Sequence, residues 1–412
     1  MKTSRRQFIN QCRTIAILSA VYGITVPRQI YGQSDDMASS IWDQRITDLL
    51  DSKKADDIIL TALGDMIWTR ELTHFDEPEF RNLYRVLQDA EITYGNLEMS
   101  LNERPDLQQG LYNYGKNREF AWEIAKLGVN LVSLANNHAF DFDVEGFKET
   151  LRILGQSGIS HAGGALSLEQ ARQASRQQFG KTRFSLLSYY SSDGATSNET
   201  GPAIATINAP KVLIEGERGE AEAISAPLER DVVLMENAIR NAKARADIVM
   251  VHYHLHWVPH SRAYPIPDTV PPHQHPMLYR AIDAGADVIF GNGPHVLRGI
   301  EIYKDKPIFY SLGNFIYQYK TDDIPPIIWT RDQQQDIQEE FQTIVPRLTV
   351  RDKKISRIEL IPCQLEMSGP RMGCPKLASD ERGSEIFDLL QRLSKPYGTR
   401  IKKRNWYATI DI

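Results

Sequence analysis

The chain has 412 residues, 42% of them hydrophobic and 25% charged, which is the composition of a globular protein with a sizeable core. This length allows one large domain with additions, or two domains. A net charge of −5 argues against a general nucleic-acid-binding protein, and three cysteines are too few for a disulfide framework.

Residues 1–32 have the features of an export signal. Two adjacent arginines, Arg5 and Arg6, precede a short apolar stretch at residues 15–26. The stretch has the length of the apolar region of a signal peptide and is too short to span a bilayer. The arginine pair resembles a twin-arginine signal. We therefore expect an exported protein, periplasmic or at the cell surface. The alternative is a basic amphipathic helix at the start of a cytosolic protein.

Strands and helices are expected to alternate along the rest of the chain. Polar residues 33–57 indicate a linker or a short surface helix. Beyond them, apolar runs of strand length alternate with segments of helical period. The expected strands are 58–63, 92–97, 129–135, 159–162, 182–190, 246–257 and 288–290. The expected helices are 80–90, 118–127, 144–154, 168–177, 231–244 and 275–284. Residues 191–226, rich in Ser, Thr, Gly and Glu, are expected to form loops. This alternation predicts an α/β fold with buried sheets.

The later part of the chain is expected to contain hairpins. The segments concerned are 300–303 with 307–311, and 343–350 with 355–361, followed by a helix at 384–393. Hairpins among alternating elements indicate a mixed sheet, or two stacked sheets flanked by helices. We expect one domain over residues 58–320, which residues 321–412 complete.

Three histidines mark the end of one expected strand. His252, His254 and His256 are spaced by two, so their side chains would leave the strand on one face. Neutral imidazole is the commonest protein ligand for transition metals. A single histidine of this kind is usually an ordinary core or surface residue. Three of the chain's ten histidines in register instead predict a metal-binding or catalytic role for at least one of them.

Other expected strands also end in possible ligands, although each one alone could serve as a turn or cap residue. These residues are Asp65, Glu98, Asn137 with His138, and His295. Ligands in α/β folds bind beyond the carboxyl ends of the strands, so these side chains would converge at one sheet edge. Oxygen and nitrogen donors suit Mn, Fe or Zn better than Ca or Mg. We therefore expect one or two divalent metal ions, in a site without cysteine ligands.

Several short motifs carry a resemblance to a known family. They are Gly64-Asp65, Asn96-Leu97-Glu98, residues 133–138, residues 281–287, Pro294-His295-Val296 and residues 310–315. In this order they resemble the CapA-type poly-γ-glutamate capsule biosynthesis family, which is similar in fold to calcineurin-like metallophosphoesterases. The resemblance implies a four-layer α/β/β/α sandwich with a dinuclear metal site.

The resemblance also implies roles for individual residues. The metal ligands would be Asp65, Glu98, Asn137, His295 and one of His254 and His256, with Glu98 bridging the metals. His138 would be the general acid or a charge stabiliser. The residues expected around the ligands are Asn96, His252, Asn292 and Asn314. The chain has Ile67 and Asn292 where histidines are expected, which predicts that one metal is weakly held or absent.

Three functions follow from these features. The first is an exported hydrolase that uses a metal-activated water on an anionic polymer or a phosphoester. The second is a non-catalytic accessory subunit of capsular polymer synthesis or export, within a membrane complex. The third is a periplasmic binding protein of unrelated fold.

Overall fold

The computed structural model describes residues 41–68, 72, 75–103, 118–192, 200–215, 221–255, 270, 274–318 and 338–412. The predicted export signal lies outside them. Residues Trp42–Ile412 belong to one folded unit. Among the described residues, no helix has the length and apolar character needed to cross a membrane.

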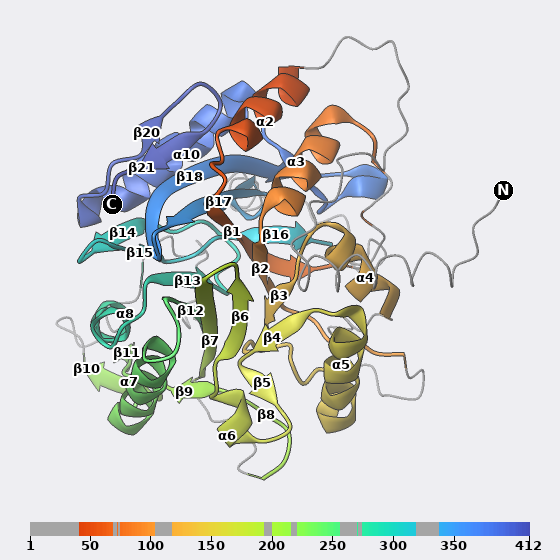
Figure 1. The fold of residues 1–412 in the computed structure, drawn as a ribbon. Helices are drawn as coiled ribbons and strands as arrows, with labels where there is room; N and C mark the ends of the chain where they lie inside the picture. The colour runs from red at the N-terminus through yellow and green to blue at the C-terminus, as the bar shows by residue number, and fades with distance from the viewer. Residues whose placement is uncertain are drawn as a thin grey trace. The chain divides into compact units, whose positions relative to one another are not determined.

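The larger sheet has ten strands and is organised around β1 (Figure 1). Strands β1 to β4 are parallel neighbours, and β16 also lies parallel to β1. Strand β17 pairs antiparallel with β1 and continues into the antiparallel strands of the C-terminal part. The bounds are β1 (Ile58–Ile67), β2 (Ile92–Leu97), β3 (Leu131–Ser133), β4 (Ser160–Ala162), β16 (Asn314–Tyr317), β17 (Gln342–Arg351), β18 (Lys354–Leu365), β19 (Pro375–Leu377), β20 (Lys402–Lys403) and β21 (Ala408–Ile410).

The second sheet has seven strands, in the order β14-β15-β13-β12-β7-β6, with β9 also paired to β7. Its centre is parallel, because β12 runs parallel to both β7 and β13. The bounds are β6 (Ser175–Phe179), β7 (Thr182–Ser192), β9 (Thr206–Asn208), β12 (Ile248–Leu255), β13 (Val288–Asn292), β14 (Ile300–Tyr303) and β15 (Lys306–Phe309). Two small sheets pair β5 (Gly164–Ala165) with β8 (Ala203–Ile204) and β10 (Lys211–Glu215) with β11 (Ala221–Ser225).

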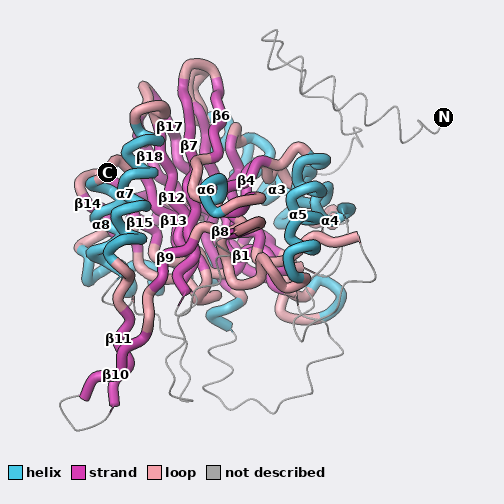
Figure 2. Tube along the Cα trace, turned by 90° about the horizontal axis from the view of Figure 1, so that it is seen from below, coloured by secondary structure: helices cyan, strands magenta, loops and turns pink. Residues whose placement is uncertain are grey.

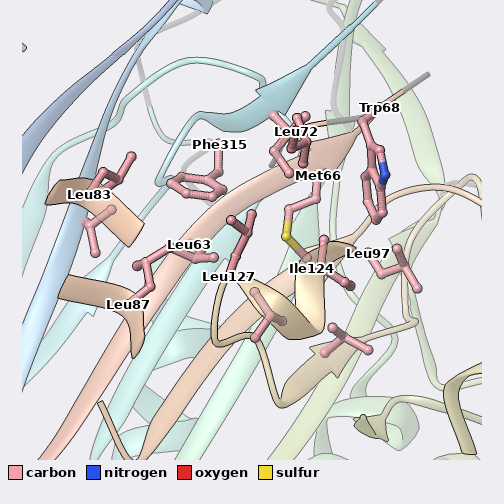
Figure 3. Close-up of a cluster of buried hydrophobic side chains, with 14 of the residues drawn as sticks. Leu63, Met66, Trp68, Leu72, Leu83, Leu87, Leu97, Ile124, Leu127 and Phe315 are labelled. Carbon is pink, nitrogen blue, oxygen red and sulfur yellow. The ribbon is translucent and has the colours of Figure 1, made fainter. Parts of the chain in front are cut away.

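The two sheets stack, and helices cover both outer faces (Figure 2). Alternate residues of a strand face opposite ways, so β1 contributes Leu60 and Ala62 to the core between the sheets and Leu63 to the helix side. Figure 3 shows the helix-side core, where Leu63 and Met66 lie among side chains of the covering helices. The predicted four-layer sandwich is confirmed.

The longer helices of the described residues fall into three groups. Those on the ten-stranded sheet are α2 (Ile41–Asp51), α3 (Pro78–Asp89), α4 (Arg118–Lys126) and α5 (Asp143–Ser157). Those on the seven-stranded sheet are α7 (Glu229–Lys243) and α8 (Gln274–Asp283). Helix α10 (Asp380–Ser394) packs on β18 and β14 and so contacts both sheets. The remaining short helices are α6 (Leu168–Ala171), η1 (Gly369–Arg371) and η2 (Lys395–Tyr397).

Three segments differ from expectation. Part of residues 33–57 forms α2, whose Ile46, Leu49 and Leu50 are buried in the helix-side core rather than at the surface. The helix expected at 168–177 ends at Ala171, and Ser175–Phe179 form the edge strand β6, because pairing with β7 there outweighs a weak helical pattern. Residues 191–226, expected as loops, contain the short strands β8 to β11.

Candidate metal centre

The candidate site lies where β1, β2, β3, β12 and β13 end. A close backbone contact brings two parts of the chain together there. A Cβ atom on Gly64 would lie 2.1 Å from the carbonyl oxygen of Gly313, so only glycine fits. The amide of Asp65 donates to that same carbonyl at 2.9 Å. As a result Asp65 in β1 is paired with Asn314 in β16.

Three fully buried side chains form the centre of the site. Asp65, Glu98 and His254 each place one ligand atom within 4.8 Å of the others, which is close enough to hold a cation. Glu98 Oε1 lies 3.5 Å from His254 Nε2 and has no hydrogen-bond partner. Burial, together with the neighbouring Asp65 carboxylate, raises the pKa of Glu98 well above its usual value. A buried, unbonded carboxylate oxygen next to a second carboxylate fits a divalent cation, and the O,O,N donor set suits Mn, Fe or Zn.

Asn96 connects these three residues. Its Nδ2 donates to Asp65 Oδ1 at 2.7 Å and lies 3.5 Å from Glu98 Oε2 and 3.1 Å from His254 Nδ1. Its Oδ1 accepts a hydrogen bond of 3.1 Å from Asn136. Because β2 carries Asn96 and β12 carries His254, this contact joins the two sheets at the site.

His295 lies beside the buried carboxylates. Its Nδ1 is 3.4 Å from Asp65 Oδ2, and its Nε2 is 3.9 Å from Glu98 Oε1. Its backbone is left-handed, with φ of 61°, which is uncommon for a non-glycine residue. Asn314 supports this conformation. Its Oδ1 lies 2.8 Å from His295 Nδ1, and its Nδ2 donates to the His295 carbonyl at 3.0 Å. The ring also stacks on Tyr317.

Asn137 and His138 follow β3 and lie at the outer side of the site. Asn137 Oδ1 is 2.8 Å from His254 Nε2. His138 Nδ1 is 2.8 Å from Asp141 Oδ2, and the two side chains are 15% and 17% exposed. The three side chains in the centre are closed to solvent, whereas this His–Asp pair and His295, which is 16% exposed, are partly accessible from outside.

The other predicted residues take different places. His252 is buried between the sheets, where Ser188 Oγ lies 2.7 Å from its Nδ1, and burial lowers the pKa of His252 to about 3. Asn292 is paired with His254 in the sheet, is buried, and makes no hydrogen bond with either side-chain polar atom. Ile67 belongs to the helix-side core. His256 lies outside the described residues.

Five of the predicted ligands therefore come together: Asp65, Glu98, Asn137, His254 and His295. Sequence reasoning gave no role to Asn136, Asp141, Ser188 or the amide of Gly293, which donates to Asp65 Oδ2 at 3.1 Å. Two of these had a local signal, since Asn136 adjoins Asn137 and Asp141 is three residues after His138. Ser188 had none, because its partners belong to distant strands.

Comparison with known proteins gives several relatives. The sequence model of the family described as "Bacterial capsule synthesis protein PGA_cap" matches residues 57–319. The uncharacterized protein y4sH of Sinorhizobium fredii is 28% identical, over 84% of this chain and 91% of that protein. Capsule biosynthesis protein CapA of Bacillus anthracis is 24% identical, over 81% of this chain and 74% of that protein. PGA biosynthesis protein CapA of Bacillus subtilis is 29% identical, over 64% of each chain.

The family match spans more than half of the chain and includes every strand end that contributes to the buried centre. The chain therefore belongs to the bacterial capsule synthesis protein (PGA_cap) family.

Proposed function

We propose that this protein is an exported, metal-dependent hydrolase of capsule or poly-γ-glutamate biosynthesis. Two of its relatives are named for capsule or PGA biosynthesis, which supports the process. The substrate class that we propose is an anionic polymer or a phosphoester. We also propose that the protein works at the outer side of the membrane, with a membrane complex for capsule synthesis as its partner.

The observation that carries the hydrolase proposal is the buried group of Asp65, Glu98 and His254. Two carboxylates closed off from water cost free energy unless a cation or strong hydrogen bonds offset their charge. Asp65 accepts from Asn96 and from Gly293, whereas Glu98 Oε1 accepts no hydrogen bond. A divalent cation held by this group would offset the charge.

The residues that would hold one or two cations are Asp65, Glu98, Asn137, His254 and His295. A divalent cation bound there would polarise a phosphoryl or acyl oxygen and lower the pKa of a bound water. His138 would protonate the leaving oxygen, since it is the partly exposed acid–base group next to Asn137. Asp141 Oδ2 lies 2.8 Å from Nδ1 of His138 and so fixes the orientation of the ring.

A second candidate, an accessory subunit without catalysis, is favoured by Ile67. This residue lies two positions after Asp65. Its apolar side chain packs into the helix-side core, so it supplies no metal ligand. Asn292 supplies a carboxamide in place of an imidazole. A site with fewer donors could bind a cation for structure alone.

The experiment that separates the two candidates uses purified full-length protein. Metal content is measured, and hydrolysis of p-nitrophenyl phosphate, bis-p-nitrophenyl phosphate and poly-γ-glutamate is assayed with and without Mn²⁺. The hydrolase proposal expects bound metal and turnover that Asp65→Asn abolishes. Bound metal without turnover would support the accessory role, and the absence of metal binding would refute both accounts of the site. Secretion of the chain, compared with an Arg5→Lys, Arg6→Lys variant, tests export.

A further inference from the structure

A buried chain of hydrogen bonds links the two sheets beneath the candidate site. Ser133 Oγ at the end of β3 lies 2.5 Å from Ser188 Oγ in β7. Ser188 Oγ lies 2.7 Å from Nδ1 of His252 in β12. All three residues are at most 2% exposed. β3 belongs to the ten-stranded sheet, and β7 and β12 to the seven-stranded sheet, so the chain crosses the interface between them.

Both ends of this hydrogen-bond chain adjoin predicted ligands. Ser133 Oγ also accepts from the amide of Ala135 at 3.2 Å, which fixes the start of the loop that carries Asn137. His252 precedes His254 by two residues in the same strand, so both rings leave β12 on one face, with ring centroids 6.3 Å apart. Asn137 and His254 in turn contact each other across the sheets.

The backbone leaves room for this link at one position. Gly163 has φ of 81°, and a Cβ atom there would lie 2.7 Å from Ser188 Cβ and 2.8 Å from Ala135 Cβ. Only glycine therefore lets the turn after β4 pass over both the serine pair and the loop.

We propose that Ser133, Ser188 and His252 form a positioning link, which holds the loop of residues 134–138 against the end of β12 and so sets Asn137 and His254 for cation binding. This inference rests on the proposed function for the cation. In it, His252 is a positioning residue and not a ligand. One direction uses the hydrogens of both serines: Ser133 donates to Ser188, and Ser188 donates to His252 Nδ1. The neutral ring then carries its proton on Nε2, which is buried and has no hydrogen-bond partner among the described residues.

The chain offers a matched control for a test. Ser185 lies in the same strand as Ser188 and is also fully buried, but its hydroxyl has no hydrogen-bond partner. Ser188→Ala removes the link, whereas Ser185→Ala removes a hydroxyl of equal burial that links nothing. His252→Asn keeps a donor and acceptor near the position of Nδ1, and His252→Phe removes both.

The first measurement uses metal-free protein, so it does not depend on the proposed function. Amide hydrogen exchange is followed at residues 134–138. We expect Ser188→Ala and His252→Phe to speed exchange there by at least about tenfold through easier local opening. Ser185→Ala and His252→Asn should leave exchange within about twofold of the original protein. Equal exchange in Ser188→Ala and Ser185→Ala would overturn the proposal.

The second measurement is the affinity for Co²⁺, with its absorption spectrum as a report on geometry. Loss of residues that orient metal ligands costs about 10–100-fold in affinity, and we expect this for Ser188→Ala with a shifted spectrum. Unchanged affinity and spectrum in a protein that binds Co²⁺ would overturn the positioning role. If the original protein binds no Co²⁺, the proposed function fails, and the exchange result alone decides whether the link exists.

Discussion

Replacing Glu98 by glutamine should stabilise the metal-free protein while removing its response to metal. Glu98 is fully buried, its Oε1 has no hydrogen-bond partner, and Asp65 lies beside it. Evolution tends to retain such strained groups where function needs them. Glutamine keeps the size of the side chain and removes the charge. It also provides amide hydrogens that can donate to neighbouring oxygens.

The size of the effect follows from the cost of an unsatisfied buried group, about 1–3 kcal/mol. We therefore expect the free energy of unfolding of metal-free Glu98→Gln to exceed that of the original protein by about this amount at pH 8. The pKa of Glu98 in the folded protein lies above the usual 4.5. The folded state therefore keeps a proton that the unfolded chain releases. The stability of the original protein then falls as pH rises from 4.5 toward the folded pKa, and the advantage of the variant widens over that interval.

Urea unfolding with a chelator present, followed by circular dichroism at pH 5 and pH 8, measures this difference. Glu359→Gln is the matched control, because Glu359 is equally buried but paired with Arg347 at 2.7 Å and with Arg357. Breaking that buried pair should cost about 3–5 kcal/mol. Metal at 100 times its dissociation constant should stabilise the original protein by about 2.7 kcal/mol and leave Glu98→Gln unchanged. If metal-free Glu98→Gln loses as much stability as Glu359→Gln, the reasoning is wrong.

Three further predictions concern the site and its support. Asp141→Asn should reduce turnover by at least about tenfold and leave the metal content unchanged. The loss should be smaller than the roughly 10²–10⁴-fold expected for His138→Ala. Turnover of Asp141→Asn equal to that of the original protein would exclude a positioning role for Asp141. Arg183 holds the pKa of Asp247 well below 3.8. The stability that Asp247 contributes is therefore present above that pH and is lost as pH falls through the lowered pKa. The free energy of unfolding of Asp247→Asn, measured between pH 7 and pH 2, should lack this loss at low pH. Gly64→Ala should lower the free energy of unfolding by at least about 2 kcal/mol, because its Cβ meets a backbone carbonyl. Gly155→Ala, in a helix with open space around it, should raise the free energy of unfolding by about 0.5–1 kcal/mol. Denaturant unfolding of the two variants compares them directly, and equal effects would contradict the packing argument.

Local pattern was enough to predict much of this molecule. The apolar run before Asp65 and the spaced histidines of β12 predicted strand ends, and parallel strands bring their carboxyl ends to one edge. Asp65, Glu98 and one of the strand histidines, His254 or His256, were therefore expected to lie together. The sandwich itself followed from the alternation of strands and helices together with the family resemblance.

Contacts between distant segments could not be predicted in this way. Spacing alone did not decide between His254 and His256, because residues two apart in a strand are expected on one face. The contacts that place His254 in the site come from Asn96 in β2 and from Asn137 after β3, in the other sheet. The burial of α2 depends on the helix-side core, which the polar composition of residues 33–57 does not reveal. The link through Ser188 needs two sheets to stack in one particular register, and a serine in a strand carries no signal for that.

The most direct test of the account is equilibrium binding of Mn²⁺ to chelator-treated protein, measured by calorimetry together with elemental analysis. The account predicts one or two ions per chain in the original protein, and loss of binding in both Asp65→Asn and Glu98→Gln. Absence of binding in the original protein, or equal binding in all three proteins, would contradict it.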